Sequence, residues 1–119
     1  MSEQPRKFPV VFYRTRAGTE VVRDWLKGLP KEDRDVIGQD LMRVQYRWPV
    51  GMPLCRSLGQ GLWEVRSDLT SSRIARVLMF FTGERIVALH GFVKKTQKTP
   101  PADLALALRR KREFERDEE

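Results

Sequence analysis

Three strand-like runs follow one another in the second half of the chain. They are Gly61–Ser67, Arg73–Phe81 and Arg85–Val93, and each is rich in β-branched or aromatic residues. The turn Thr82–Glu84 between the last two runs is short enough for a β-hairpin. Because hairpin connections reverse the chain direction, this pattern predicts neighbouring strands of a mostly antiparallel sheet.

The first half of the chain predicts one strand followed by two helices. The β-branched and aromatic run Phe8–Tyr13 is typical of a strand. Apolar residues at helical spacing between Val22 and Leu29 predict a helix that ends at Pro30. A second helix begins at Lys31, with acidic residues in its first turn, where they suit the helix dipole. Its apolar stripe consists of Ile37, Leu41, Val44 and Trp48.

The C-terminal part of the chain predicts a short helix. Thr99 suits its N-cap and Pro100 its first helical position. Residues 113–119 form a charged tail that is expected to fray. The predicted order is β-α-α-β-β-β-α within a single domain of residues 1–119. We therefore predict an α+β fold, in which a mostly antiparallel four-stranded sheet has two helices on one face and a short C-terminal helix.

Length and composition exclude several classes of protein. The 119 residues suit one domain, and 40% hydrophobic with 33% charged residues predicts a folded chain. No run approaches the roughly 18 apolar residues of a membrane span, and Met1–Lys7 lacks the apolar stretch of a signal peptide. A single cysteine, Cys55, excludes an internal disulfide and a cysteine-rich zinc site. We therefore expect a cytoplasmic protein with no membrane partner.

Positive charge is concentrated in one part of the sequence. Residues 54–112 contain twelve Lys and Arg against four Asp and Glu, a net charge of +8. Residues 1–53 carry +3 and residues 113–119 carry −4, which gives the overall +7. A local basic surface favours a polyanionic partner: nucleic acid first, an acidic protein segment second and an anionic membrane third.

Five cations lie on or beside the later predicted strands: Arg66, Arg73, Arg76, Lys94 and Lys95. An arginine inside an apolar run, such as Arg76, is costly to bury unless it is paired or faces a groove. Taken alone, one such arginine is better explained by pairing with Glu64 or by exposure to solvent. Taken together, five converging cations repel one another unless an anion binds between them.

The residue types near these cations leave few catalytic mechanisms. The single histidine excludes a two-histidine acid–base mechanism, and the nearby carboxylates lack the spacing of a two-metal nuclease site. The sequence has no glycine-rich phosphate loop. What remains is stabilisation by Arg and Lys of the charge that builds on a phosphodiester when the neighbouring 2′-hydroxyl attacks it. That reaction requires RNA, because DNA lacks the 2′-hydroxyl, and it requires no metal or cofactor.

Other conspicuous side chains have simpler explanations. His90 is better explained as a strand histidine that is hydrogen-bonded within the fold than as a catalytic group. Cys55 has no histidine at a recognisable spacing, so we assign it no role. Trp25 and Trp63 are expected in the core. Phe92, which lies beside the lysines in sequence, is the aromatic residue best placed to stack on a base.

Three segments together resemble the core pattern of the RelE/ParE-superfamily toxins. They are Gly61–Arg66 (GLWEVR), Arg73–Val77 (RIARV) and His90–Pro100 (HGFVKKTQKTP). The similarity covers roughly the last 60 residues and is closest to the phage-associated HigB-like branch. The lysine-rich third segment is its most specific part, and the β-α-α order of the first half agrees with the architecture of this family.

This resemblance implies the toxin of a type II toxin–antitoxin system. Such a toxin enters the ribosomal A site and cleaves the mRNA there as a metal-independent endoribonuclease. It is inhibited by an antitoxin encoded beside it, often a helix-turn-helix protein of the HigA kind. The toxin–antitoxin pair binds operator DNA through this antitoxin. The implied partners are therefore this antitoxin, mRNA and the ribosome.

The resemblance also implies roles for particular residues. By position, Arg66 and Arg76 match the basic residues that bind or activate the scissile phosphate. Lys94 and Lys95 match the basic pair at the end of the last strand, and these four are the predicted catalytic residues. Four further residues are predicted to bind RNA: Arg56, Arg73, Phe92 and Lys98.

The chain departs from the pattern of this family in one respect. Many RelE-type toxins have a tyrosine near the C-terminus that stacks on the substrate base. The only tyrosines here are Tyr13 and Tyr46, both in the first half of the chain. The resemblance therefore leaves the base-stacking residue and the general base unassigned.

Two other functions agree with parts of the sequence. A ParE-like protein of the same fold poisons DNA gyrase by protein contact, and a non-catalytic nucleic-acid-binding regulator also presents a basic surface. A protein-contact poison needs no convergent cations, and no helix here shows an apparent set of base-reading side chains. The basic strands therefore favour a ribonuclease.

Overall fold

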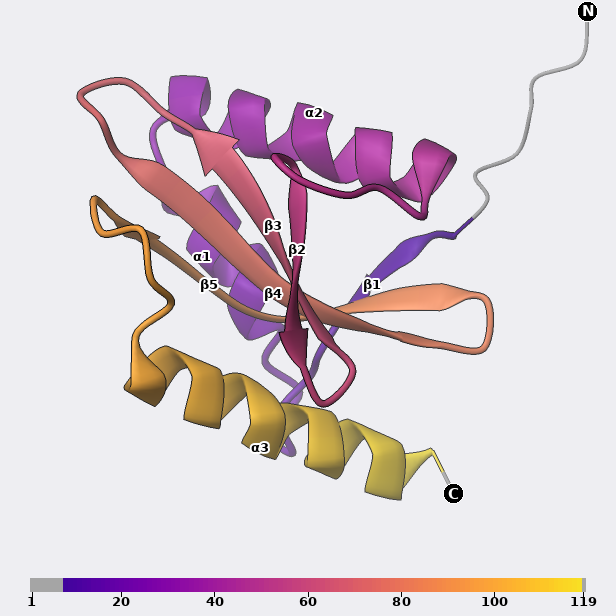
Figure 1. Cartoon of the computed structure of the whole chain (residues 1–119). Helices are drawn as coiled ribbons and strands as arrows, with labels where there is room; N and C mark the ends of the chain where they lie inside the picture. The colour runs from indigo at the N-terminus through magenta and orange to yellow at the C-terminus, as the bar shows by residue number, and fades with distance from the viewer. Residues whose placement is uncertain (1–7, 119) are drawn as a thin grey trace, which may run out of the picture.

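A computed structural model of the chain describes residues 8–118. Their elements are, in chain order (Figure 1), β1 (Val10–Phe12), α1 (Val21–Lys27), α2 (Lys31–Arg47), β2 (Cys55–Gly59), β3 (Leu62–Asp68), β4 (Ile74–Thr82), β5 (Arg85–Lys94) and α3 (Pro101–Asp117). None of the helices between residues 8 and 118 has the length and apolar character that crossing a membrane requires. The prediction about a signal peptide concerns Met1–Lys7, which lie outside the described residues.

The strands form one mixed sheet in the order β1-β5-β4-β3-β2. The pairs β2–β3, β3–β4 and β4–β5 are antiparallel, whereas β1 pairs with β5 in parallel. The prediction of a four-stranded sheet was wrong, because Cys55–Gly59 adds an edge strand. This strand is short, and its exposed Arg56 and Ser57 interrupt the apolar alternation by which the longer strands are recognised.

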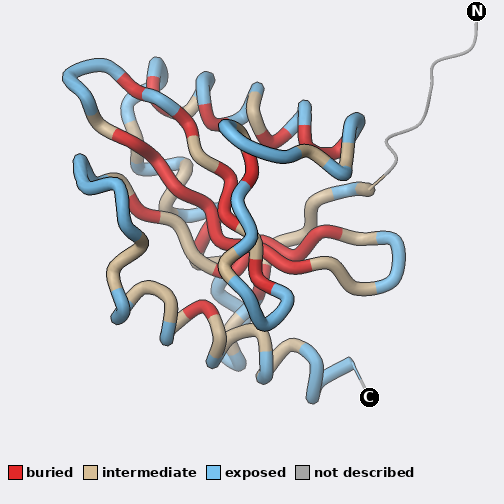
Figure 2. The backbone as a smooth tube through the Cα atoms, viewed as in Figure 1, coloured by how far each residue is buried: buried red, intermediate tan, exposed pale blue. Residues whose placement is uncertain are grey.

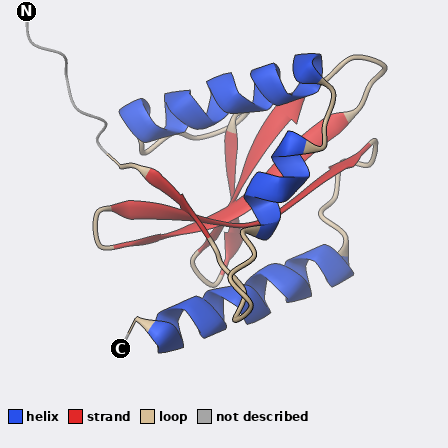
Figure 3. Cartoon of the chain, turned by 180° about the vertical axis from the view of Figure 1, so that it is seen from behind, coloured by secondary structure: helices blue, strands red, loops and turns tan. Residues whose placement is uncertain are grey.

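Helices cover both faces of the sheet (Figure 3). As predicted, α1 and α2 lie on one face, where residues such as Ile37 pack with Val77 of β4. On the opposite face, Ala107 of α3 packs with Leu78 of β4. Consequently β4 is buried along most of its length (Figure 2), which explains its almost continuous apolar sequence.

The C-terminal helix is longer than predicted. It continues through Asp117, so the predictions of a short helix and of a frayed segment from residue 113 were wrong. Its last turns are held by specific contacts: the ring of Phe114 packs edge-on against Phe80 at a centroid distance of 5.7 Å. In addition, Tyr13 donates a hydrogen bond to Glu113. These contacts hold the last turns of α3 against the rest of the protein. The charged sequence of those turns does not by itself indicate such packing.

Asp33 ties the start of α2 to the connection between β3 and β4. Its carboxylate accepts two hydrogen bonds from Arg73, from Nη1 to Oδ2 at 2.8 Å and from Nη2 to Oδ1 at 3.0 Å. These bonds hold the pKa of Asp33 below its ordinary value, although burial acts in the opposite direction. The pair therefore stabilises the fold when the carboxylate is ionised.

We expect the Asp33→Asn variant to be less stable than the wild type at neutral pH and similar to it in acid. A carboxylate whose pKa is lowered by folding stabilises the protein above its unfolded pKa. That stabilisation is lost as the pH falls from the ordinary value of 3.8 through the lower folded pKa. Urea unfolding across this pH range measures the difference.

The matched control for this experiment is Asp35→Asn on the same helix. Asp35 is half exposed and forms an ion pair with Lys31, so its loss should change stability little. A stability difference between Asp33→Asn and the wild type that stays constant into strong acid would contradict the assigned role of Asp33.

Candidate functional site

Three arginines and one carboxylate lie on neighbouring strands, on the α3 side of the sheet. Strand pairing places Arg56 opposite Glu64 and Arg66 opposite Arg76, so these residues lie side by side on β2, β3 and β4. They share a face with Leu62, which packs with α3, because alternate residues of a strand point to the same side. We call Arg56, Glu64, Arg66 and Arg76 the arginine cluster.

Arg76 anchors the segment between β5 and α3. The side chain of Arg76 is fully buried and donates hydrogen bonds to the backbone carbonyls of Lys98, at 3.3 Å, and of Thr96. We call residues 95–100 the anchored segment. Burial lowers the pKa of Arg76, and the other arginines of the cluster add to this effect against the attraction of Glu64. Arg76, predicted to bind the scissile phosphate, thus contacts other parts of the protein and has no exposed surface.

Glu64 is the carboxylate at the centre of the cluster, and it is also fully buried. Its Oε2 accepts a hydrogen bond from Thr99 and lies 3.8 Å from Nε of Arg76, while its Oε1 lies 3.8 Å from Nε of Arg66. Thr99 was predicted to cap the last helix, which instead begins one residue later than expected, at Pro101. One carboxylate among three guanidinium groups leaves an excess of positive charge, which a bound anion would neutralise.

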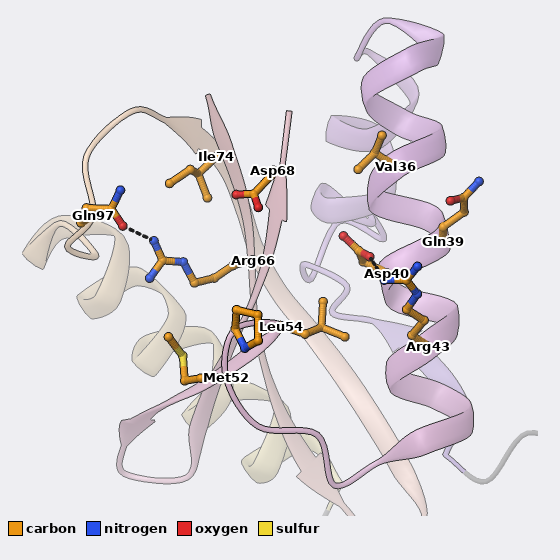
Figure 4. Close-up of a pocket in the computed structure, with 11 residues that line it drawn as sticks. Val36, Gln39, Asp40, Arg43, Met52, Leu54, Arg66, Asp68, Ile74 and Gln97 are labelled. Carbon is orange, nitrogen blue, oxygen red and sulfur yellow. Dashed lines mark hydrogen bonds and ion pairs between the residues drawn. The ribbon is translucent and has the colours of Figure 1, made fainter. Parts of the chain in front are cut away.

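Arg66 lies at the rim of the arginine cluster. Its side chain is 12% exposed, and its Nη2 donates a hydrogen bond of 2.8 Å to Oε1 of Gln97 (Figure 4). Because Gln97 belongs to the anchored segment, this bond fixes the guanidinium against that segment. Arg66 also lines a hollow of about 550 Å³ beside α2. It is therefore positioned by protein contacts and still accessible from outside.

The predicted lysines lie in or next to the anchored segment. Lys94 ends β5 and forms an ion pair with Asp103 in the first turn of α3, with a distance of 3.0 Å from Nζ to Oδ2. Lys95 and Lys98 are exposed. Since Arg76 binds the backbone of this segment, it also fixes the stretch of chain that carries both exposed lysines.

Phe92 and His90 are engaged within the fold. Phe92 is only 8% exposed, and its ring lies 5.4 Å from the ammonium of Lys94 and 5.8 Å from the guanidinium carbon of Arg76. Nε2 of His90 lies 2.6 Å from Oδ1 of Asp103. Burial alone would raise the pKa of Asp103, but the hydrogen bonds from His90 and Lys94 hold it below its ordinary value. The ring of Phe92 therefore has cations of the protein as its neighbours and offers no open face on which a base could stack.

Two other residues considered from the sequence lie outside the arginine cluster. Arg73, predicted to bind RNA, is held by Asp33 of α2. Cys55 is buried, and burial raises the pKa of its thiol to about 12 with a further contribution from Asp40. A thiol with such a high pKa is not ionised near neutral pH, so Cys55 has no nucleophilic thiolate to offer.

The tryptophans belong to the core. Trp48 and Trp63 pack edge-on with ring centroids 4.8 Å apart. Trp25 of α1 lies so close to Gly91 of β5 that a Cβ atom built there would approach its ring carbons to 2.4 Å. The glycine in the HGF part of the lysine-rich segment is therefore required for the packing of α1 on the sheet.

The polar partners of the cations were the part of the site that the sequence predictions missed. The sequence predictions named Glu64 only as one possible partner of Arg76, and they gave no role to Gln97 or Asp103. The alternation of Glu64 with Arg66 on one strand is the signal that places them on the same face. No three His, Cys, Asp or Glu side chains within residues 8–118 are grouped as a metal site requires.

Comparison with known proteins identifies the family of the chain. Residues 24–112, roughly three-quarters of the sequence, match the family described as phage-derived protein Gp49-like (DUF891). No curated protein matches the sequence. The matched range contains the arginine cluster and the anchored segment, and it confirms the predicted relation to RelE/ParE-like toxins at the level of the family. The chain belongs to the Gp49-like family of RelE/ParE-like toxins.

Proposed function

We propose that this toxin is a metal-independent endoribonuclease that cleaves mRNA, with its site at the arginine cluster and the anchored segment. The family is associated with toxin–antitoxin systems, which implies a cognate antitoxin. The observation that carries the catalytic proposal is that Arg66 and Arg76 both form ion pairs with the buried carboxylate of Glu64, while Arg56 lies opposite Glu64 on the neighbouring strand. A site with this excess of positive charge suits a polyanionic substrate.

The proposed reaction is attack of a ribose 2′-hydroxyl on the adjacent phosphorus. The P–O2′ bond forms as the P–O5′ bond breaks, which leaves a 2′,3′-cyclic phosphate and a 5′-hydroxyl. Negative charge on the non-bridging oxygens grows in the transition state, so a guanidinium that donates to them accelerates the reaction. Arg66 is the candidate for this contact, because it is held in place by Gln97 and remains partly exposed.

In this proposal Arg76 and Glu64 act as positioning residues. Both are fully buried, so their effect on RNA passes through the groups that they hold. Arg76 fixes the backbone of the anchored segment, and Glu64 lies between the guanidinium groups of Arg66 and Arg76. Their contribution is a site that is already formed before RNA arrives, which avoids reorganisation during the reaction.

The remaining cations are proposed to move protons and to attract RNA. Lys94 and Lys95 are the candidates for transferring the proton that the 2′-hydroxyl loses and the proton that the departing 5′ oxygen gains. Arg56 lies opposite Glu64 on β2, and Lys98 belongs to the anchored segment; both are exposed and are proposed to attract the RNA backbone without contacting the reacting bond.

We further propose that cleavage takes place in the ribosomal A site and that the antitoxin is a helix-turn-helix protein of the HigA kind. The similarity of residues 90–100 to the HigB-like branch supports both points. In this view the toxin acts in the cytoplasm and reaches operator DNA only through the antitoxin.

Primer extension on mRNA after induction of the chain tests the ribonuclease proposal. We expect growth arrest and discrete cuts within codons, because cleavage removes the messages that ribosomes are translating. Co-expression of the antitoxin should suppress both effects. An induced Arg66→Ala variant that accumulates to the same level is the matched control and should leave mRNA uncut.

Two results would contradict the ribonuclease proposal. One is normal growth with intact mRNA under strong induction of the wild-type chain. The other is growth arrest with intact mRNA and trapped gyrase–DNA complexes, which would identify a gyrase poison of the same fold.

A further inference from the structure

We propose that the hollow beside Arg66 binds one base of the RNA and prefers guanine. This inference rests on the proposed ribonuclease function, because it places the base next to the phosphate that Arg66 holds. The hollow lies between α2, the loop that precedes β2 and the end of β3 (Figure 4). Its volume of about 550 Å³ falls in the range of roughly 300–1,000 Å³ that is typical of small-molecule sites.

Apolar side chains form part of the wall of the hollow. Met52 is 62% exposed there, Val36 is also exposed, and Leu54 and Ile74 complete the apolar surface. Exposed apolar side chains that line one concave surface together indicate a binding site. The flexible thioether of Met52 is suited to pack against the face of an aromatic ring such as a base.

The hollow provides a place for a base in a chain without a C-terminal tyrosine. Tyr13 is buried in the cluster of residues that packs with α3. Tyr46 is exposed on α2 but does not line the hollow, and Phe92 is covered by cations. Met52 and Arg66, by contrast, line the same hollow, so a ring and its phosphate can be held together.

The charges around the hollow favour a phosphate at its rim and a neutral ring inside. Arg66 lies on one side, and the carboxylates of Asp40 and Asp68 and the guanidinium of Arg43 also line the hollow. Asp40 already accepts a hydrogen bond of 2.7 Å from Ser67 and lies 3.5 Å from Nη1 of Arg43. Because Arg43 is engaged with Asp40 and the carboxylate of Asp68 repels a phosphate, the phosphate binds at Arg66 and the interior takes the base.

Asp68 is positioned to read the edge of that base. It lies two residues after Arg66 on β3, so the two side chains share a face of the strand. Two residues of a strand span about 6.8 Å, which is comparable to the separation of phosphate and base within one nucleotide. Figure 4 shows Arg66, Asp68 and Ile74 on one side of the hollow and Val36 of α2 on the other.

The chemistry of a carboxylate selects guanine among the four bases. An ionised carboxylate only accepts hydrogen bonds, and it does so through two oxygens. Guanine presents two adjacent donors, the N1–H and the N2 amino group, whereas adenine and cytosine place an acceptor beside their amino group. Uracil has one donor between two acceptors. Guanine is therefore the base to which Asp68 can bind by two parallel, charge-assisted hydrogen bonds.

Binding of non-cleavable RNA tests the proposal on the full-length protein. The probes are fluorescent 2′-O-methyl uridine hexamers with guanine, inosine or uracil at one position, measured by fluorescence anisotropy. Inosine lacks only the N2 amino group, so we expect the guanine probe to bind about tenfold more tightly than the inosine probe. Asp68→Asn should reduce this ratio to near one, and Met52→Ala should weaken all three probes severalfold.

The matched control is Met42→Ala, which removes another exposed methionine that lies on α2 but does not line the hollow. It should change neither the affinities nor the ratio. Equal affinity of the wild type for guanine and inosine would overturn the base site, and so would an unchanged ratio in a folded Asp68→Asn variant. Loss of antitoxin binding by Asp68→Asn with unchanged RNA binding would also overturn it, because the hollow would then be a protein-docking surface.

Cleavage of the matching unmethylated RNAs, free and in ribosomes, separates this inference from the proposed function. Cleavage that shows no base preference overturns the base site alone. Guanine-selective binding without any cleavage overturns the ribonuclease and leaves the base site in place. Absence of binding to every probe overturns the base site whatever the outcome of the cleavage assay.

Discussion

Single-turnover cleavage by the Arg66→Ala variant is expected to be about a hundredfold to a thousandfold slower than by the wild type. Loss of one well-placed donor to a developing negative charge typically raises the barrier by about 2.7–4 kcal/mol. Arg66 meets the structural requirement for such a donor, because Gln97 fixes its guanidinium and its side chain is still 12% exposed. Arg66→Lys should restore activity only in part, since lysine keeps the charge but loses the planar fork.

Parallel binding measurements distinguish this effect from weaker attraction to RNA. Arg66→Ala should lower affinity far less than rate, because the contact forms mainly in the transition state. Lys98→Ala, which removes an exposed cation from the anchored segment, should lower affinity modestly and flatten its salt dependence. If Arg66→Ala is folded by circular dichroism and cleaves at nearly the wild-type rate, the site is elsewhere.

The Arg76→Ala variant is expected to lose about 3–5 kcal/mol of unfolding free energy, which is the usual effect of removing one partner of a buried ion pair. The substitution would leave Glu64 buried without the guanidinium of Arg76, whose Nε lies 3.8 Å from Oε2 of Glu64. It would also free the carbonyls of Thr96 and Lys98 from their donor. Urea unfolding of the full chain measures the loss.

A second variant tests whether the buried charge is the cause. Combining Arg76→Ala with Glu64→Gln removes the unpaired carboxylate and should recover part of the lost stability. Arg56→Ala removes an exposed arginine of the same cluster, so its effect should stay within about 0.5 kcal/mol. An Arg76→Ala variant with the stability of the wild type but greatly slowed cleavage would show that Arg76 contacts RNA and does not act by positioning.

Much of the fold could be predicted because its long elements follow simple periodicities. The two N-terminal helices and the three long strands are recognisable from apolar spacing alone. Strand β2 was missed because an edge strand with exposed polar residues does not show that alternation. The length of α3 was missed for a related reason: its last turns depend on Tyr13 and Phe80, which lie far away in the sequence.

The candidate site, like the fold, has one part that could be predicted from local sequence and another that could not. The neighbourhood of Arg66 and Arg76 follows from strand alternation and pairing, both of which are local properties. Two other features depend on tertiary contacts: the pairing of Arg73 with Asp33 of α2 and the anchoring of residues 95–100 by Arg76. A sequence shows that such residues are charged, but it does not show which partner reaches them.

The parallel pairing of β1 with β5 delays completion of the sheet during synthesis, because the two strands are far apart in the sequence. Val10 pairs with Ile86, so the first strand has no partner in the sheet until Ile86 has left the ribosome. The carbonyls that bind Arg76 belong to Thr96 and Lys98, which are translated later still. Long-range pairing of this kind forms slowly, because the intervening chain must close a large loop. The nascent chain therefore completes its arginine cluster only after Thr96 and Lys98 have left the ribosome.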